Sequence, residues 1–457
     1  MASQRPKFTD ATTAARLLTE LGQEFAVVEN LSHIFPPYDL YALAPARHKV
    51  RDGLAAAVMD MDGTTTTTEP LCINALQTMV GRISGLDADA KWPGLDPVRD
   101  YPHIIGNSTT RHVEYLLKTY GAQIDPQCFM RALVHAAAWT IGYSKDASRR
   151  NDLDSLLAVL GIAGIKKDSR FTALTKIDRH DGVAEREAIA TLAGELAPLF
   201  PANDFARLTR ASVEIYYQRY HELLAAVASA DGKPLPAYLK APSDGLLIQP
   251  MPGIGIFLAL ITGLLGKEAA WVVPTLRDHL QGLSHDSATP VDGAETTLPW
   301  LGKRFAERPA KVALVTSSIA YEAGVVLHEV FRQLREECGA WGLTDGTHER
   351  IHHCFRSPES FYDAIITASD SCEMRLKPHR DLYSLALGRL GLNPDQFENV
   401  AGFEDSESGT IAIRAAGISV CCALPFHMTA GHGFQAATHT CAGGLPEVIL
   451  KEHCFLP

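Results

Sequence analysis

Apolar residues follow two different spacings along the 457-residue chain, and the change between them divides the chain into regions. Residues 54–59 form a short apolar run that stops at an acidic, glycine-containing turn, which is typical of a buried parallel strand. Between residues 69 and 247, apolar positions recur at i, i+3 and i+4, most clearly in 183–200 and 205–228. The sequence therefore predicts one strand followed by a large region of helices.

Beyond residue 250, strand patterns and helix patterns alternate. The predicted strands are 311–315, 363–366, 399–403 and 418–423, and the predicted helices are 320–338, 381–390 and 406–416. Such alternation predicts a doubly wound parallel sheet. We therefore expect an α/β fold, with a doubly wound, Rossmann-like parallel sheet and a large, mostly helical domain inserted after the first strand.

These patterns predict three regions of the chain and two insertions. We expect a helical N-terminal lead-in packed on the core, an α/β core in two segments with two loop insertions, and a helical cap domain. The corresponding residues are 1–50 for the lead-in, 51–68 and 250–457 for the core, 266–300 and 339–358 for the insertions, and 69–249 for the cap. A helix is predicted at 11–21 within the lead-in.

Composition narrows the classes of function. The chain is 46% hydrophobic and 21% charged, which is ordinary for a globular protein. Its formal net charge of −11 argues against nucleic-acid binding and against an anionic membrane surface. The N-terminal residues show no secretory signal, and the longest apolar stretches are too short to cross a bilayer. Nine cysteines without a framework indicate reduced thiols, so we expect a cytoplasmic protein.

Two aspartates follow the first predicted strand, in the string Asp60-Met61-Asp62-Gly63-Thr64. Residues i and i+2 of an extended chain point to the same side, so both carboxylates can converge on one bound group. One carboxylate can attack phosphorus while the other handles the proton of the leaving group. Gly63 permits a sharp turn behind them. The alternative is an acidic turn without chemistry.

Three further polar motifs lie at later strand ends or before a helix. A hydroxyl with neighbouring backbone N–H groups suits a phosphoryl oxygen, a lysine can neutralise phosphoryl charge, and paired carboxylates suit Mg²⁺. The motifs are Thr316-Ser317-Ser318, Lys377-Pro378 and Glu404-Asp405-Ser406. Because ligands of parallel sheets bind outside the carboxyl ends of the strands, we expect these residues to converge.

With these four motifs, the chain resembles the haloacid dehalogenase-like superfamily, and in particular its capped phosphatases and its β-phosphoglucomutase-like members. The resemblance covers residues 54–70 and most of 310–450. It includes the stretch RLKPHRDLYSLALGRLGLNPDQFENVAGFEDSESGTIAIRAAGIS. It is weaker in the predicted cap.

The resemblance implies a role for each motif. Asp60 would attack the phosphoryl group to form an aspartyl-phosphate, and Asp62 would protonate the leaving oxygen and then activate water. Thr316 would bind a phosphoryl oxygen, and Lys377 would balance charge. The implied Mg²⁺ ligands are Asp60, the Asp62 carbonyl, Glu404 and Asp405, and the candidate substrate contacts are Gly63, Thr64, Ser317 and Ser318. An aspartate at position 62 favours phosphate esters over dehalogenation.

The expected function is a Mg²⁺-dependent phosphatase acting on a small phosphorylated metabolite. A phosphomutase of a sugar phosphate would use the same motifs, and a non-catalytic binding protein built on this fold is a second alternative. Arg82, Arg111 and His112 in the predicted cap are candidates for binding the leaving group. The sequence gives neither the substrate nor the oligomeric state.

One further motif points to different chemistry. His348-Glu349-Arg350-Ile351-His352 matches the HExxH helix of zinc proteases, in which two histidines share one helix face. The motif lies in a predicted insertion, and the sequence offers no evident scaffold for a third ligand. Solvated loop residues, a structural metal site and a zinc protease are the alternatives for this string.

Overall fold

The computed structural model describes residues 8–30, 35–86, 92–104, 108–180, 182–239, 246–283, 293–370, 375–426, 429 and 431–457. The chain forms two compact units. We call them the core unit, which comprises Met1–Thr67, Pro250–Ala323 and Val330–Pro457, and the helical unit, which comprises Thr68–Gln249 and Gly324–Glu329.

The strands of the described chain are β1 (Phe25–Glu29), β2 (Tyr38–Ala42), β3 (Ala56–Asp60), β4 (Thr66–Thr67), β5 (Gln249–Pro250), β6 (Lys311–Val315), β7 (Ala364–Ile366), β8 (Val400–Glu404), β9 (Val420–Ala423) and β10 (His439–Thr440). Helices before residue 250 are α1 (Ala11–Leu21), α2 (Glu69–Ser84), α3 (Tyr101–Ile104), α4 (Thr109–Tyr120), α5 (Pro126–Tyr143), α6 (Ala147–Val159), α7 (Ser169–Leu174), α8 (Val183–Leu196) and α9 (Phe205–Ala230). Helices after it are α10 (Ile254–Ile261), α11 (Val273–Leu283), α12 (Ala294–Glu307), α13 (Ala320–Glu337), α14 (Asp345–Cys354), α15 (Pro358–Phe361), α16 (Asp381–Arg389), α17 (Glu407–Ala415) and α18 (Gly444–Glu447).

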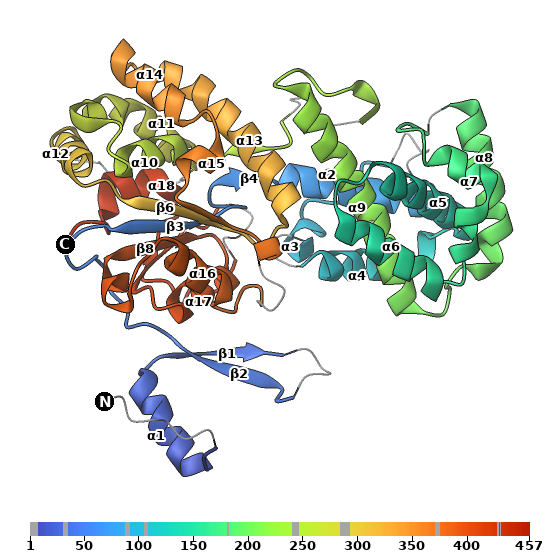
Figure 1. Cartoon of the computed structure of the whole chain (residues 1–457), viewed down its shortest axis with the longest axis horizontal. Coiled ribbons are helices and arrows are strands. Elements are labelled where there is room, and N and C mark those ends of the chain that lie inside the picture. Colours follow the sequence, from blue (N-terminus) through green and yellow to red (C-terminus); the bar gives the residue numbers. More distant parts are fainter. Residues whose placement is uncertain are drawn as a thin grey trace. The chain divides into compact units, whose positions relative to one another are not determined.

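The core unit is built on a six-stranded sheet with the order β10-β9-β8-β3-β6-β7, in which every neighbouring pair is parallel (Figure 1). From β3 the chain passes to β6 and β7 on one side, then returns to β8, β9 and β10 on the other. The strand order therefore reverses between β3 and β8, which is where open parallel sheets bind their ligands. The predicted α/β class with a parallel sheet is confirmed.

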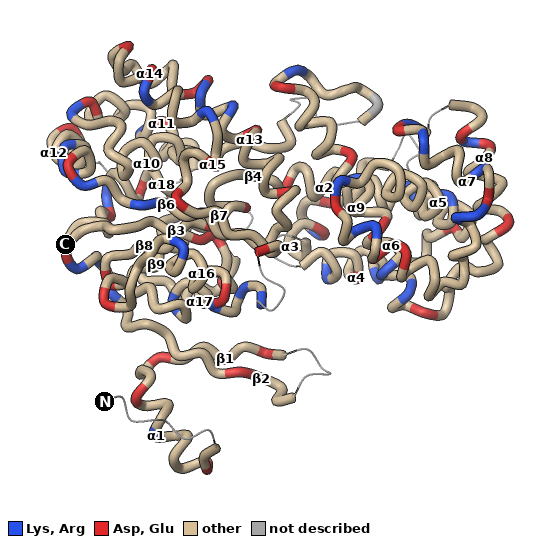
Figure 2. Tube along the Cα trace, in the orientation of Figure 1, with Lys and Arg blue, Asp and Glu red and all other residues tan. Residues whose placement is uncertain are grey.

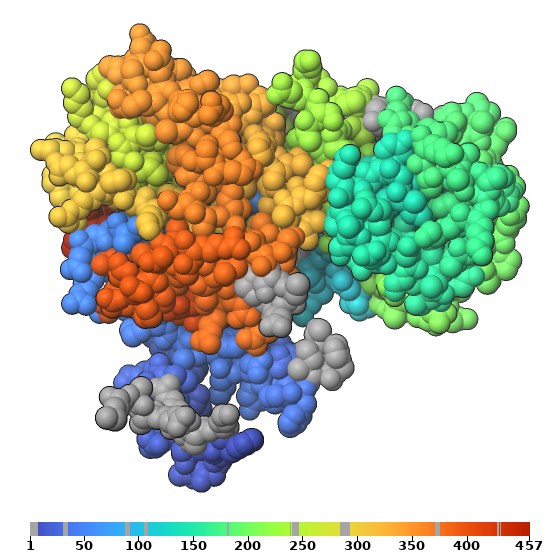
Figure 3. All heavy atoms as spheres, in the orientation of Figure 1, coloured from blue at the N-terminus to red at the C-terminus, as the bar shows by residue number. Residues whose placement is uncertain are grey.

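Helices cover both faces of this sheet, as expected for strands that are apolar on both sides. On one face, α16 and α17 pack on a buried cluster that includes Val58, Val315 and Ile413. On the other face, Phe257 of α10 meets Phe403 of β8 edge to face, with ring centroids 5.0 Å apart. Figure 1 shows α10, α11 and α18 on that side, and in the space-filling view residues from the later part of the chain, coloured orange, make up much of the visible surface of the core unit (Figure 3).

The element predictions held where the apolar patterns were long, and failed at short or irregular segments. The strand 311–315 and the helix 11–21 coincide with β6 and α1. The predicted insertions contain the regular helices α11, α12 and α14, although residues 284–292 of the first insertion lie outside the described residues. The antiparallel hairpin of β1 and β2, and the two-residue strand β10, were not predicted.

Arg414 of α17 attaches the segment after this hairpin to the core unit. Its guanidinium is 1% exposed and donates hydrogen bonds to the carbonyl oxygens of Ala44 and Ala436. It also donates to the Glu24 carboxylate at 2.6 Å, although the Glu24 side chain is 56% exposed. The buried carbonyls, rather than the exposed ion pair, therefore contribute most of this attachment.

Replacing Arg414 with Met should lower the free energy of unfolding of the core unit by about 3 kcal/mol, because two buried carbonyls lose their donors. Glu24→Gln, which changes only the exposed partner, should lower it by less than about 1 kcal/mol. Urea unfolding, combined with hydrogen exchange of residues 25–42, measures both effects. Equal losses in the two variants would contradict this account.

The helical unit contains no strand among its described residues between 69 and 247, as predicted. Helices α2, α5 and α9 pack against one another and bury Met79, Leu133 and Leu223. Acidic and basic positions alternate along the trace of both units (Figure 2). No helix in the described part of the chain combines the length and the apolar character needed to cross a bilayer.

One carboxylate of the helical unit is fully buried in a hydrogen-bonded network. Asp100 accepts bonds from Arg99 Nε at 2.8 Å, Tyr120 OH at 2.8 Å and Tyr115 OH at 3.0 Å. Burial by itself raises the pKa of Asp100, but the donors at Arg99, Tyr120 and Tyr115 outweigh it and hold the pKa at about 2. The network therefore stabilises the charged carboxylate.

The stability of the helical unit should fall in acid because of Asp100. The pKa of Asp100 in the folded state lies below its ordinary value. Its contribution to the free energy of unfolding, about 2 kcal/mol, is therefore complete above about pH 5 and is lost as the pH falls toward 2. Urea unfolding at a series of pH values should show this slope in the wild type and a flatter one in Asp100→Asn. The same slope in both proteins would show that Asp100 is not the group responsible.

Candidate active site

Three neighbouring strands bring the predicted motifs to one edge of the sheet. Asp60, the last residue of β3, pairs in register with Val315 of β6, and Thr316 follows directly. Met59 pairs with Phe403 of β8, which places Glu404 level with Asp60 on the other side. The two acidic motifs therefore lie on either side of the point where the strand order reverses.

The buried ammonium group of Lys377 joins these strands. Its Nζ donates to Asp60 Oδ1 and, at 2.7 Å, to Glu404 Oε1. The three side chains are only 8%, 8% and 1% exposed, so water does little to screen the charges. Lys377 lies far from both partners in sequence, before α16, and its position shows that the loops after β7 and β3 converge.

The pKa shifts at this site follow from burial and from an excess of negative charge. Burial raises the pKa of Asp60 well above its ordinary value, Lys377 opposes this, and Glu404 and Asp62 add to it. Burial lowers the pKa of Lys377. The negative charges of Asp60 and Glu404 raise it by more than burial lowers it, so the ammonium group stays charged. Lys377 therefore opposes the effect of burial on Asp60, and the carboxylates in turn hold the ammonium group in its charged form.

Glu404 is fixed by residues to which the sequence analysis gave no role. Its Oε2 accepts from the backbone N–H of Ser406 at 2.9 Å and from the Ser406 hydroxyl at 2.8 Å. Its Oε1 accepts from Tyr383 OH at 3.3 Å. The buried Tyr383 ring also lies 5.3 Å from Lys377 Nζ, which allows a cation–π contact. Ser406 belongs to the predicted motif, but nothing in the sequence marks Tyr383.

The second aspartate faces the hydroxyl groups that follow β6. Asp62 Oδ2 accepts from Thr316 Oγ1 at 3.5 Å and from Ser318 Oγ at 3.4 Å. The backbone N–H of Ser318 donates to Thr316 Oγ1 at 3.0 Å, which orients this hydroxyl. Ser317 is exposed instead. The structure therefore brings Asp62, Thr316 and Ser318 together as expected, and turns the Ser317 residue toward solvent.

Gly63 and Thr64 lie in the tight turn that follows β3. Gly63 has a φ of 78°, and a Cβ atom at this position would lie 2.3 Å from Asp405 Oδ2. A side chain would thus displace Asp405, so Gly63 is required for close approach as well as for the turn. Thr64 is 1% exposed, and its hydroxyl has no hydrogen-bond partner in the described structure.

The oxygen atoms present fit a divalent cation. Asp60, Glu404 and Asp405 are buried and each offers a carboxylate oxygen within 4.8 Å of the others, the one such group among the described residues. Asp60 and Glu404 contact Lys377 and Asp405 completes the cluster, so three carboxylates and one ammonium group give a formal charge of −2. Hard oxygen donors with excess negative charge are the environment that Mg²⁺ prefers. The Asp62 side chain is not part of this group.

The HExxH string does not form a comparable cluster. It lies on α14, where His348 and His352 have ring centroids 5.9 Å apart. The neighbours in the surface hollow around them include Arg335 and Arg356, which oppose a cation. Among the described residues, no third ligand joins the two histidines.

Three candidates from the sequence lie in the helical unit and outside this cluster. Arg82 is partly buried on α2, Arg111 is exposed on α4 and His112 is buried on the same helix. Their predicted contact with a leaving group stays a prediction.

Replacing Gly409 with Ala should weaken Mg²⁺ binding about 10- to 100-fold, because a Cβ at this α17 position would lie 1.7 Å from Glu404 Oε1 and displace the carboxylate. Gly388→Ala is the matched control, since its Cβ would meet nothing within 4 Å on the neighbouring helix α16. Calorimetric titration of Mg²⁺ into each variant measures the effect. Unchanged Mg²⁺ affinity in Gly409→Ala would remove Glu404 from the ligand set.

No protein-family model matches the chain, and no curated protein matches it in sequence. Solved structures do match. CbbY from Rhodobacter sphaeroides in complex with phosphate is 15% identical, with 86% of this chain and 96% of that chain covered and a TM-score of 0.37. A mutant of CbbY in complex with xylulose 1,5-bisphosphate is 14% identical, with 85% and 93% covered and a TM-score of 0.35. A β-phosphoglucomutase from Clostridium difficile is 11% identical, with 85% and 90% covered and a TM-score of 0.29.

Further similar structures carry the names of phosphoglycolate phosphatases. Because the identities are low and the TM-scores lie between 0.29 and 0.37, these matches do not indicate what this chain acts on. Phosphatases and phosphomutases are the kinds of protein named among these matches, as they are in the resemblance of the motifs. In its motifs and its parallel sheet, the chain is similar to haloacid dehalogenase-like phosphatases and phosphomutases.

Proposed function

We propose that this protein is a Mg²⁺-dependent phosphatase that hydrolyses a small phosphorylated metabolite through an aspartyl-phosphate on Asp60. The observation that carries the proposal is the buried contact of Lys377 with both Asp60 and Glu404, at the reversal point of a parallel sheet. A purely structural role would not require three buried carboxylates to gather beside a single ammonium group, because that arrangement is electrostatically unfavourable without a further cation.

In the proposed reaction, a carboxylate oxygen of Asp60 attacks phosphorus, and the bond between phosphorus and the ester oxygen breaks. Asp62 gives its proton to that leaving oxygen. Asp62 then takes a proton from a water molecule, the resulting hydroxide attacks phosphorus, and the bond to Asp60 breaks to release inorganic phosphate and restore both carboxyl groups.

Other residues of the site position these two aspartates. The Thr316 hydroxyl, oriented by the Ser318 backbone, is placed to donate to a phosphoryl oxygen once the substrate replaces its contact with Asp62. Lys377 favours the ionised form of Asp60 against the effect of burial, and it balances the negative charge that the substrate adds. Bound Mg²⁺ would neutralise phosphoryl charge, held by Asp60, Glu404, Asp405 and the carbonyl oxygen of Asp62.

Replacing Asp60 with Asn should abolish phosphate release, by at least about 10³-fold, because the amide cannot act as the nucleophile. The assay follows release from p-nitrophenyl phosphate and from a panel of phosphorylated metabolites, with Mg²⁺ or with EDTA. Asp395→Asn, an exposed aspartate on the core unit, is the control and should keep full activity. Asp62→Asn should slow the breakdown of the aspartyl-phosphate, which mass spectrometry of the quenched enzyme can detect.

The outcomes separate the proposal from its alternatives. Isomerised sugar phosphate without free phosphate would replace the phosphatase with a phosphomutase that uses the same residues. No turnover of any panel member by folded, Mg²⁺-loaded protein would favour a binding protein on this fold. Mg²⁺-dependent release that survives in Asp60→Asn would overturn the assignment of the nucleophile.

A further inference from the structure

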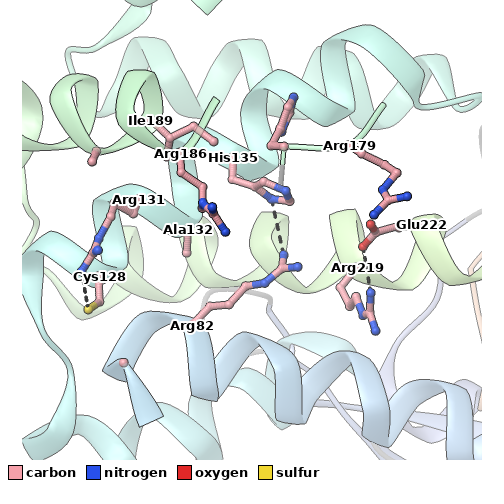
Figure 4. A pocket seen from close by; sticks show the side chains of 13 residues that line it. Arg82, Cys128, Arg131, Ala132, His135, Arg179, Arg186, Ile189, Arg219 and Glu222 are labelled. Carbon is pink, nitrogen blue, oxygen red and sulfur yellow. Dashed lines mark hydrogen bonds and ion pairs between the residues drawn. The ribbon is translucent and has the colours of Figure 1, made fainter. Parts of the chain in front are cut away.

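A second cavity, unrelated to the acidic cluster, lies entirely within the helical unit. It has a volume of about 670 Å³, within the range that small-molecule sites occupy. Its lining side chains come from α2, α5, α8, α9 and the segment before α8, and Figure 4 shows them around a common space. Arg82 lies on α2, 13 residues after Glu69, the first residue of that helix. This separation corresponds to about 20 Å along the helix axis.

The charge of this cavity is opposite to that of the chain. Five arginines line it, namely Arg82, Arg131, Arg179, Arg186 and Arg219, against the single carboxylate of Glu222. Five positive charges and one negative charge give a formal charge of +4, whereas the whole chain carries −11. Arginine stays protonated in proteins, so the cavity cannot relieve this repulsion by releasing protons.

Two of the arginines are fixed in place by neighbouring polar groups. Arg82 donates to Gln218 Oε1 at 2.7 Å and lies 3.4 Å from His135 Nδ1. Arg219, which is 4% exposed, donates to Glu222 at 3.0 Å and to the carbonyl oxygen of Leu239. Figure 4 shows the Arg82 guanidinium directed toward His135, whereas the Arg219 guanidinium lies beside Glu222. These donors are therefore positioned before any ligand arrives, which reduces the entropy lost on binding.

Two buried nitrogen atoms of the lining have no partner in the described structure. They are Nδ1 of His180, a residue 7% exposed, and Nε of Arg219. His180 uses its other nitrogen, Nε2, to donate to the Leu174 carbonyl oxygen at 2.9 Å, so Nδ1 remains for another group. A buried donor or acceptor without a partner is unfavourable. An anion in the cavity could accept from the Arg219 Nε–H, and a hydroxyl group on the same ligand could donate to His180 Nδ1.

His135 responds to the same excess of positive charge. His135 meets His180 edge to face, with ring centroids 4.9 Å apart. Burial lowers the pKa of His135 well below its ordinary value, and the charges of Arg82, His180 and Arg219 lower it further. The cavity therefore excludes additional positive charge and favours an anion.

We propose that this cavity binds an organic anion that carries two phosphoryl groups, such as a sugar bisphosphate. Two dianionic phosphoryl groups match the formal charge of +4, and guanidinium forks bind phosphate through paired hydrogen bonds. Ala132 and Ile189 provide apolar surface for a carbon skeleton between the two charged groups. The site is independent of the proposed phosphatase activity, because all of its residues belong to the helical unit.

The test is calorimetric titration of fructose 1,6-bisphosphate in EDTA, using Asp60→Asn so that turnover is absent. We expect binding, and a loss of at least about tenfold in affinity in the double variant Arg179→Ala/Arg186→Ala, since both side chains are exposed and their removal leaves the fold intact. Lys145→Ala/Arg207→Ala removes two exposed charges outside the cavity and should bind like the parent. Hydrogen exchange should slow on binding in residues 128–135 and 182–190.

Further ligands decide the class of anion. Fructose 6-phosphate and inorganic phosphate, which carry one phosphoryl group, should bind at least about tenfold more weakly than the bisphosphate. Citrate should bind more weakly as well. No binding of the bisphosphate, or equal binding by Arg179→Ala/Arg186→Ala, would overturn the site. Equal affinity for fructose 6-phosphate or for citrate would overturn the assignment to two phosphoryl groups. A failed phosphatase assay with intact bisphosphate binding would affect only the proposed function.

Discussion

The buried ammonium group of Lys377 is the interaction on which the candidate active site depends. Asp60 and Glu404 end two neighbouring strands, and both are almost completely removed from water. Two carboxylates at this depth repel one another, and burial alone would favour their protonation. A cation between them opposes this effect and favours the ionised form of Asp60, which a nucleophile requires. The price of this arrangement is a continued excess of negative charge, and that excess is what makes a divalent cation a fitting addition.

The sheet topology explains why such a cluster forms at this place. In a parallel sheet all strands end at the same edge, so residues distant in sequence meet there without any further device. The strand β3 lies between β6 and β8, and each of the three contributes one motif that begins at its last residue or directly after it. Glycines then allow the carboxylates to come close: Gly63 leaves room for Asp405 and Gly409 leaves room for Glu404. The small residues of the motifs are thus as important for the geometry as the charged ones.

The sequence was sufficient where one residue pattern had one physical meaning. The strand 311–315 and the helix 11–21 have strong periodic patterns, and both were predicted at their observed bounds. The strand β10 has only two residues and depends on pairing with β9, so no local pattern marks it. Tyr383 looks like any aromatic core residue of α16 until the fold places its hydroxyl beside Glu404. Residue roles that arise from tertiary contacts alone were therefore beyond prediction.

The cationic cavity shows the same limit more strongly. Its arginines extend from Arg82 to Arg219 and come from four helices and a connecting segment, and charged residues on helices ordinarily face solvent. Nothing in their spacing distinguishes them from such residues, and the acidic composition of the chain points away from them. In the fold, however, hydrogen bonds to side chains and to a carbonyl group hold Arg82 and Arg219 in place beside a common cavity. Positive charge gathers there without a matching number of carboxylates. Formal composition thus describes the average surface of this protein, whereas binding depends on local charge. The two units concentrate opposite charges, an anionic cluster suited to a metal ion in one and a cationic cavity suited to phosphoryl groups in the other.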